Sequence, residues 1–351
     1  SSQITLTLWH QMGPSERSAL LAEIARFEDL HPGVHVEEIY KETEELRSGF
    51  QAAVLAGVGP ELVYGPADPV GPYHKMGIIQ DLSVSFTAEE LAEFEAAALI
   101  WIPSTKPPHR PELALIGDRL GNHLALVYNR KLLPEPPKTT SEMVRMAKAL
   151  TVDRDGDGKI DQYGIVWNFT EPYFAVPFLT GFGGWLFQEG ESRTPNLDTP
   201  QVADALQFIV DLSEKHRVIP RNCDYNSADS LFKSGQAAML INGDWSWRDY
   251  LEDDRLDAAI APLPVVDETG RPMGPMTAPK GYSLNAVAQG DRAKAAIEFI
   301  RYMTSAETQS RFLHTLRTLP SRKALYNDPI LKTDPVLRAS HEQLRNGRPT
   351  P

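Results

Sequence analysis

The sequence predicts an α/β protein that folds into two lobes. Its 351 residues exceed the size at which single hydrophobic cores stop growing, about 250–300 residues, so two domains are expected. Residues 4–39 read as a strand, a helix and a second strand in succession. This order is typical of parallel strands joined by a crossover helix. We therefore expect each lobe to contain a mostly parallel sheet that is flanked by helices.

The first elements have clear boundaries. Apolar residues alternate with threonine over Ile4–Trp9, as in a strand with one buried face. Residues 15–30 then carry apolar side chains at helical spacing, namely Leu20, Ile24 and Phe27. Pro32 and Gly33 end this helix, because proline cannot continue the hydrogen-bond ladder and glycine permits a reversal. Val34–Ile39 is the second strand.

Further strands are expected along the chain. Pro60–Tyr64 is a short strand after a helix that ends near Gly57-Val58-Gly59, and the continuous apolar run Leu124–Tyr128 is typical of a strand buried on both faces. Ser283–Val287 is a further strand and follows directly on Lys280-Gly281-Tyr282.

Helices are expected between these strands. Thr139 and Glu142 form a capping-box pattern ahead of a helix over 143–150. A second helix starts at Pro200 and is expected to bury one apolar face, made of Val202, Leu206, Ile209 and Val210. A third carries the stripe Ala296, Ile300 and Met303.

The composition excludes several classes of protein. The chain has 35 Lys and Arg against 47 Asp and Glu, for a formal charge of −12, so it lacks the basic footprint of a nucleic-acid binder. No apolar run approaches the roughly 18 residues that a transmembrane helix requires. The first residues, Ser1-Ser2-Gln3, do not read as a signal segment. Cys223 is the only cysteine, which excludes an intrachain disulfide and predicts an idle buried thiol.

Several segments resemble one protein family. They are Gly59–Tyr64, Tyr128–Thr139, Asn168–Phe174, Gly183-Gly184 and Ile241–Trp247. In this order and with similar gaps, they resemble bacterial extracellular solute-binding proteins of ABC importers, most closely the maltose/maltodextrin-binding branch. The resemblance implies a two-lobed periplasmic-binding-protein fold with hinge crossovers. The first lobe would comprise residues 1–120 and 277–315, and the second residues 121–276 and 316–351.

The resemblance also implies a sugar site. Residues of this sequence match positions that contact sugar in the family: Asp68, Glu171, Tyr173, Phe174 and Trp245. Other polar or aromatic residues are expected near the site: Gln11, Glu16, Arg119, Asn122 and Tyr282. The chain departs from the family pattern at Gly65, Pro69 and Asn122, which leaves the exact sugar open. Carboxylates accept hydrogen bonds from hydroxyl groups, and aromatic faces cover the C–H patches of a sugar ring.

Aromatic clusters are more often core than binding site. Tyr173, Phe174 and Trp245 would then pack inside, as we expect of Trp247. A further stacking tryptophan of the family lies on helices that follow a segment like Arg348–Pro351. This sequence ends there, so it represents either a shortened form or one in which the aromatic is supplied differently.

The implied function is to bind malto-oligosaccharides such as maltose and maltotriose in the interlobe cleft and to deliver them to the membrane permease of an ABC importer. Such a protein would be a periplasmic or cell-surface monomer without catalytic residues and would require no cofactor. One alternative is a binding protein for another disaccharide such as trehalose. The other is a glycoside hydrolase in which Asp68 and Glu171 flank the scissile bond.

One loop has the pattern of a calcium site. Side-chain oxygens of Asp153, Asp155, Asp157 and Asp161, with the carbonyl of Lys159, follow the ligand order of an EF-hand loop. Gly158 occupies the position of the sharp turn, but Gly164 stands where the bidentate glutamate belongs. The loop is therefore either a weak structural calcium site or a solvated turn.

Overall fold

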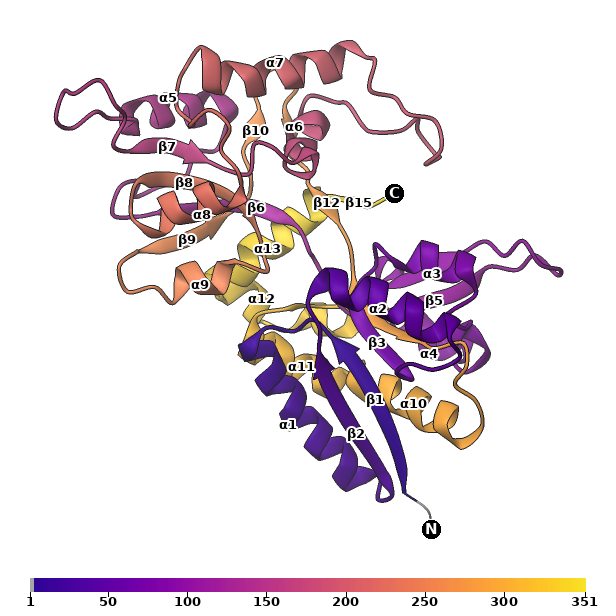
Figure 1. Ribbon diagram of the computed structural model, residues 1–351. Helices are drawn as coiled ribbons and strands as arrows, with labels where there is room; N and C mark the ends of the chain where they lie inside the picture. The colour runs from indigo at the N-terminus through magenta and orange to yellow at the C-terminus, as the bar shows by residue number, and fades with distance from the viewer. Residues whose placement is uncertain (1–2) are drawn as a thin grey trace. The chain divides into compact units, whose positions relative to one another are not determined.

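The computed structural model describes residues 3–351, and the chain divides into two compact units (Figure 1). Unit 1 contains residues 3–120 and 278–331, and unit 2 contains residues 121–277 and 332–351. Residues 316–331, which the sequence placed in the second lobe, belong to unit 1. The reason is that Leu319 and Pro320 pair with a central strand of that unit.

Unit 1 is built on a seven-stranded sheet in the order β14-β5-β13-β3-β1-β2, with β4 also paired to β5. β1 pairs in parallel with β2 and β3, whereas β13, β14 and β4 form antiparallel pairs. The strands are β1 (Ile4–His10), β2 (Val34–Tyr40), β3 (Leu62–Pro66), β4 (Leu99–Ile102), β5 (Glu112–Leu120), β13 (Lys280–Leu284) and β14 (Leu319–Pro320).

Helices pack on this sheet, and the first of them confirms the sequence prediction. α1 runs from Pro14 to Leu30 and buries Leu20, Ile24 and Phe27. The remaining helices of unit 1 are α2 (Thr43–Leu55), α3 (Val70–Met76), α4 (Ala88–Ala92), α10 (Gly290–Met303) and α11 (Ala306–Leu316). Short 3₁₀ turns are η1 (Leu82–Val84), η2 (Ala96–Ala98) and η4 (Lys323–Asn327).

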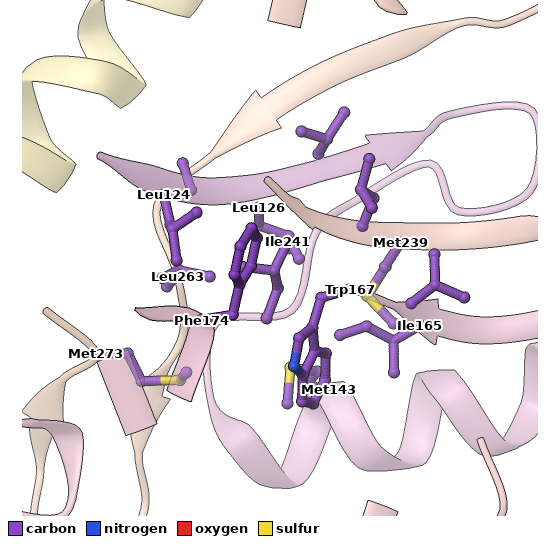
Figure 2. Packing of buried hydrophobic residues seen from close by; sticks show 14 of the residues in the cluster. Leu124, Leu126, Met143, Ile165, Trp167, Phe174, Met239, Ile241, Leu263 and Met273 are labelled. Carbon is purple, nitrogen blue, oxygen red and sulfur yellow. The ribbon is translucent and has the colours of Figure 1, made fainter. Parts of the chain in front are cut away.

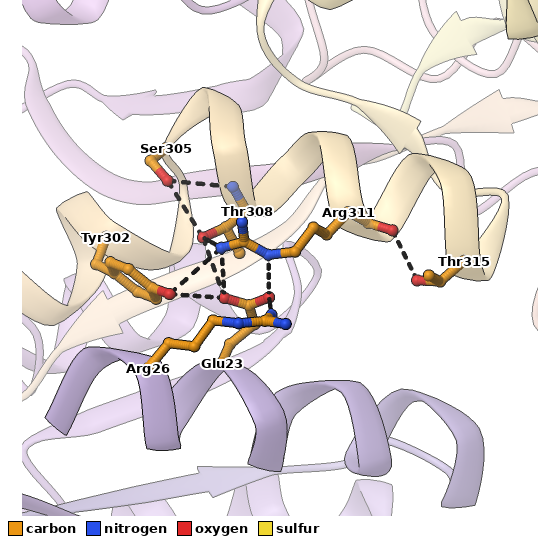
Figure 3. A network of polar contacts seen from close by, with 7 residues as sticks. All are labelled: Glu23, Arg26, Tyr302, Ser305, Thr308, Arg311 and Thr315. Atoms are coloured by element: carbon orange, nitrogen blue, oxygen red, sulfur yellow. Dashed lines mark hydrogen bonds and ion pairs between the residues drawn. The ribbon is translucent and has the colours of Figure 1, made fainter. Parts of the chain in front are cut away.

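A buried carboxylate connects α1 to α11. Glu23 is 2% exposed and accepts hydrogen bonds from the guanidinium of Arg311 at 2.5 and 2.8 Å. Tyr302 donates to the same carboxylate at 2.8 Å, and Arg26 donates at 2.7 Å (Figure 3). A buried charge is stable only when it is paired and hydrogen-bonded, and Glu23 meets both conditions.

Unit 2 contains a four-stranded sheet in the order β7-β8-β6-β9. α5 packs beside β7, and α13 packs beside β9 (Figure 1). Its strands are β6 (Leu124–Asn129), β7 (Tyr163–Val166), β8 (Ala237–Gly243) and β9 (Ala258–Ala261). Two small two-stranded sheets complete the unit. One pairs β10 (Val265–Val266) with β11 (Arg271–Pro272), and the other pairs β12 (Met276–Thr277) with β15 (Arg348–Pro349). The helices are α5 (Thr140–Leu150), η3 (Pro172–Ala175), α6 (Val176–Gly181), α7 (Pro200–Glu214), α8 (Tyr225–Lys233), α9 (Trp247–Leu251) and α13 (Pro335–Asn346), while α12 (Ile330–Thr333) lies at the boundary between the units.

The core of unit 2 lies around the central strands. Leu126 of β6 and Ile241 of β8 are fully buried, and Trp167 belongs to the same cluster (Figure 2). Gly164 permits α5 to approach β7, because a β-carbon there would lie 2.2 Å from the carbonyl oxygen of Ala147. Cys223 is buried as predicted, and burial raises the pKa of its thiol to about 11.

Three sequence expectations about the elements are wrong in detail. Both large sheets are mixed rather than mostly parallel: β13, β14 and β4 form antiparallel pairs in unit 1, and β6 pairs antiparallel with β8 and β9 in unit 2. The strand expected over 283–287 spans Lys280–Leu284. On α7, Leu206 and Val210 are about half exposed because the buried face is centred on Val202, Ala205, Ile209 and Leu212. Within residues 3–351, no helix has the length and apolar character needed to cross a membrane.

Candidate functional site

The first part of the candidate site lies in unit 2, where β8 ends and β6 begins. Gly243 at the end of β8 pairs with Leu124 at the start of β6. The residues that follow β8 therefore lie beside those that precede β6. The backbone N–H of Asp244 donates to the carbonyl of His123 at 3.1 Å. The Asp244 carboxylate accepts from the backbone N–H of Asn122 at 3.0 Å.

Trp245 presents an aromatic surface at this edge. Its side chain is 43% exposed, and its indole N–H donates to the Tyr225 hydroxyl at 3.0 Å. The Tyr173 ring lies 6.3 Å from the Trp245 ring between centroids. A ring that is held by a hydrogen bond while one part of it stays in contact with solvent is suited to stack against a flat ligand.

Polar groups of Asn122 and Glu171 lie near the Tyr173 end of this aromatic pair. The Tyr173 hydroxyl donates to the carbonyl of Asn122 at 2.8 Å, which fixes the tyrosine ring against the turn before β6. Asn122 itself has a φ of 46°, in the left-handed region that asparagine tolerates. Glu171 is exposed, and one of its oxygens accepts from the Asn168 amide at 2.9 Å. The sequence-predicted residues of unit 2 thus include exposed hydrogen-bond acceptors and an exposed ring.

Phe174 does not present its ring to solvent, and this corrects the expectation that it contacts the sugar. It is 2% exposed and lies within the apolar cluster of unit 2 (Figure 2). Its ring packs edge-on against that of Tyr173, with 5.7 Å between centroids. Phe174 therefore packs against Tyr173 from within the apolar cluster. Trp247 is 5% exposed, as the sequence predicted.

Gln11 and Asp68 line a second, separate feature in unit 1. β1 and β3 are parallel neighbours, so the segments after their carboxyl ends meet at one edge of the sheet. A pocket of about 130 Å³ lies there, lined by Gln11, Thr43, Glu44, Leu46, Arg47, Val63, Gly65, Pro66, Asp68, Pro69, Val70, Tyr73, Leu115, Gly281 and Ser283. Although Asp68 is exposed, the surrounding protein removes part of its hydration and raises the pKa of its carboxyl. Lys280 acts in the opposite direction.

Arg119 and Glu16 form a closed ionic network in unit 1. Arg119 is 7% exposed and donates to Glu16 at 2.8 Å and to Asp118 at 3.0 Å. Asp118 also accepts from the Tyr64 hydroxyl at 2.8 Å. Burial alone would lower the pKa of Arg119, but the neighbouring carboxylates hold it well above its usual range. The positive charge of the Arg119 guanidinium is thus balanced by carboxylates of the same unit.

Tyr282 is likewise internal, and this corrects its placement at an open site. The side chain is fully buried, and its ring lies 4.8 Å from that of Tyr64 between centroids. β13 begins at Lys280 and runs between β3 and β5, so Tyr282 sits in the middle of the sheet.

The acidic loop of unit 2 joins two bridged residues, Val152 and Gln162. Carboxylate oxygens of Asp153, Asp155 and Asp161 lie within 4.8 Å of one another. Asp153 accepts from the backbone N–H groups of Gly156 and Gly158 at 2.9 and 2.8 Å. These bonds, that of Gly158 first, lower the pKa of the Asp153 carboxyl.

Asp157 joins this group through its backbone, whose N–H donates to the Asp155 carboxylate at 3.1 Å, and its own carboxylate is not one of the three. The Asp157 carboxylate accepts from the backbone N–H of Lys159 at 2.8 Å. The calcium ligand set that the sequence suggests is therefore brought together in part, through three of its carboxylates.

Sequence reasoning missed several residues of both features. Asp244, Tyr225 and His123 join the unit 2 cluster only through the pairing of β6 with β8 and the position of α8. Thr43 and Arg47 reach the pocket of unit 1 from α2. The single local signal was that Asp244 directly precedes Trp245.

Comparison with known proteins identifies the family. The chain is 26% identical over 334 residues to the maltotriose-binding protein of Pyrococcus abyssi, covering 95% of this chain and 70% of that protein. The maltose/maltodextrin-binding domain of Bdellovibrio bacteriovorus bound to maltotriose is 41% identical, with a TM-score of 0.85 and coverage of 99% and 89%. The maltotriose-binding protein of Thermus thermophilus bound with maltotriose is 27% identical, with a TM-score of 0.80 and coverage of 99% and 88%. Residues 22–339 match the family described as bacterial extracellular solute-binding protein, and the chain belongs to that family.

Proposed function

We propose that this protein binds malto-oligosaccharides and delivers them to the membrane permease of an ABC importer. The observation that carries the proposal is the exposed ring of Trp245 beside Tyr173, with the exposed Glu171 two residues before Tyr173 in the chain. The similar structures from Bdellovibrio and Thermus, both bound to maltotriose, support the same ligand class.

The chemistry of the unit 2 cluster suits a glucose oligomer. A glucose ring has C–H patches on its faces and hydroxyl groups around its rim. The indole of Trp245 would cover one face, while Glu171 would accept hydrogen bonds from the rim. The pocket of unit 1 has polar groups of the same kind, Asp68 and Gln11, which suit sugar hydroxyl groups. Phe174 and Tyr282 leave the set of direct contacts because they are buried.

Calorimetric titration with maltotriose tests the proposal. Wild-type protein should bind, and Trp245→Ala should weaken binding by about 1–4 kcal/mol, the range of aromatic hot-spot truncations. Trp101→Ala is the matched control, because Trp101 of β4 is 42% exposed and lies outside both candidate features. Equal affinities of Trp245→Ala and Trp101→Ala would remove Trp245 from the site.

Two further measurements on the same protein sample test the alternative functions. A parallel titration with trehalose shows whether this disaccharide is preferred over maltotriose. Prolonged incubation with maltotriose, followed by chromatography, distinguishes binding from hydrolysis. We expect intact maltotriose, since the proposal assigns Asp68 and Glu171 to hydrogen bonding and includes no bond cleavage. Released glucose or maltose would favour the hydrolase.

We further propose a location and an oligomeric state for the protein. It works outside the cytoplasmic membrane, in the periplasm or at the cell surface, as a monomer that docks on its permease. The family description, bacterial extracellular solute-binding protein, supports the location outside the cytoplasmic membrane. Light scattering coupled to size-exclusion chromatography should give the mass of a single chain, 39.0 kDa. A mass of twice that value would overturn the monomer.

A further inference from the structure

A buried histidine with one unpaired ring nitrogen lies behind the Trp245 edge of unit 2. His123 is fully buried, and its Nδ1 atom makes no hydrogen bond within the part of the chain that the structure describes. On the other side of the ring, Nε2 lies 3.4 Å from the Ser340 hydroxyl. The ring packs edge-on against Trp247, with 5.7 Å between centroids. Buried polar atoms are normally paired, so this nitrogen calls for an explanation.

The nearest acceptor to this nitrogen is the carboxylate of Asp244. Oδ2 of Asp244 lies 3.8 Å from His123 Nδ1, which is beyond the usual 2.7–3.2 Å of a hydrogen bond. The same oxygen accepts from the Asn122 N–H at 3.0 Å. Gly121 contributes space for this arrangement, since a β-carbon there would lie 2.7 Å from Oδ2 and 3.0 Å from Nδ1. A small shift of Asp244 would complete the bond to His123.

The carboxylate is also accessible to a ligand. The Asp244 side chain is 27% exposed, and Asp244 directly precedes the exposed Trp245 in the chain. Among the described residues, contacts are made through Oδ2, so Oδ1 remains available as an acceptor. A carboxylate that is anchored through one oxygen and open at the other is arranged to receive a hydroxyl group.

We infer that Asp244 is a further sugar-contacting residue, which accepts a hydrogen bond from a hydroxyl of the glucose ring on Trp245, and that His123 is its positioning residue. The inference rests on the proposed function. Binding draws the carboxylate into a single orientation in which Oδ2 is held by both Asn122 and His123. The unpaired Nδ1 atom of His123 is the donor that completes this orientation.

Maltotriose titration of Asp244→Asn tests the contact. The substitution keeps the shape of the side chain but replaces an acceptor-only group by an amide. Affinity should fall about tenfold or more, the scale of one hydrogen bond to a charged group. Asp254→Asn is the matched control, because Asp254 is an exposed aspartate of the same unit and should bind as wild type does. Equal affinity of the two variants overturns the inference.

The positioning role has its own readout. Nitrogen-15 NMR of the histidine rings in wild-type protein should show a shift of the His123 Nδ1 signal on addition of maltotriose, and Asp244→Asn should abolish that shift. His123→Asn retains a donor near the Nδ1 position and should keep most of the affinity, whereas His123→Leu should lose it. An unchanged His123 signal in saturated wild-type protein overturns the positioning role even where a His123 variant fails to fold.

The two proposals fail in different ways. Wild-type protein that binds no malto-oligosaccharide contradicts the proposed function, and this inference with it. Wild-type protein that binds, with Trp245→Ala weakened but Asp244→Asn equal to Asp254→Asn, contradicts this inference alone.

Discussion

The indole ring of Trp245 lies against the backbone of Gly243, two residues earlier in the chain. A β-carbon on Gly243 would lie 2.0 Å from ring atom Cζ3, a distance that no real contact allows. The absence of a side chain at this last residue of β8 therefore permits the ring to fold back along the strand. The hydrogen bond from the indole to Tyr225 then fixes it there.

Gly243→Ala should weaken maltotriose binding by displacing the Trp245 ring, with a loss approaching that of Trp245→Ala. Calorimetric titration measures the effect. The double variant Gly243→Ala with Trp245→Ala is the control, because removing the indole removes the three nearest atoms that the new methyl group would meet. The double variant should bind no more weakly than Trp245→Ala alone. If Gly243→Ala binds as wild type does, the ring orientation is irrelevant to the ligand.

Asp68 should make sugar binding sensitive to acid. Partial loss of hydration raises the pKa of its carboxyl above the usual value of 3.8. Only the ionised form accepts a hydroxyl hydrogen bond with both oxygens, so affinity should fall as the pH decreases through this raised pKa. Maltotriose titrations at a series of pH values measure the decline. In Asp68→Asn, affinity should be lower at neutral pH and should vary less with pH.

Asp29→Asn serves as the control for that series. Asp29 is an exposed residue of α1 outside the unit 1 pocket. Its variant should retain the wild-type pH profile. A profile of Asp68→Asn that matches the wild type would assign the acid sensitivity to another group.

The buried Glu23 should stabilise unit 1 at neutral pH. Burial alone would raise its pKa, but hydrogen bonds from Arg311 and Tyr302 and the charges of Arg311 and Arg26 lower it below the ordinary 4.5 (Figure 3). A carboxyl whose folded-state pKa is lowered contributes its stability above the unfolded value. That contribution is lost as the pH falls from 4.5 through the folded-state pKa.

Glu23→Gln should therefore lower the free energy of unfolding at pH 7 by about 1–3 kcal/mol, the cost of leaving buried partners of a charged group underused. Denaturant titration at pH 7 and at pH 4 measures the change. The difference between wild type and variant should shrink at the lower pH. A difference that stays constant would show that the charge of Glu23 contributes nothing, and Asp29→Asn should leave stability unchanged at both values.

The elements that local sequence determines were the ones predicted best. α1 begins one residue before its predicted start and ends at the predicted residue, because Pro14 at the first turn and the turn after Leu30 set both ends locally. Gln11 and Asp68 were both predicted near a site, and both line one pocket. Parallel strands bring the residues after their carboxyl ends together whatever the intervening sequence.

Features that depend on distant pairing were not predicted. The antiparallel partners of β6 lie more than a hundred residues away, so their direction is set by the path of the chain and not by a local pattern. Phe174 and Tyr173 are adjacent aromatics, and sequence alone does not show which of them turns inward. Asp244 lies within the segment Ile241–Trp247, but the sequence did not indicate a role for it, because only the pairing of Leu124 with Gly243 places it beside Asn122.

The acidic loop should respond to calcium if it holds the ion. Three carboxylates whose oxygens lie within 4.8 Å of one another repel, and a bound cation would relieve this repulsion in the folded state. Binding to the native state alone raises stability by mass action. Calcium should therefore raise the melting temperature, and a chelator should lower it. Because Gly164 stands where a bidentate glutamate belongs, the titration must extend to about millimolar calcium, the range of weak extracellular sites.

Asp155→Ala should abolish this response, whereas Asp254→Ala, at an exposed aspartate outside the loop, should preserve it. Magnesium should substitute poorly, because it demands near-ideal octahedral geometry and releases its waters reluctantly. Differential scanning fluorimetry with each metal and with chelator measures all three effects. A melting temperature of the wild-type protein that is indifferent to calcium and chelator would mean that Asp153, Asp155 and Asp161 form a solvated turn. In that case hydrogen bonds from within the loop, those of the backbone N–H groups of Gly156 and Gly158 among them, would stabilise the Asp153 carboxylate.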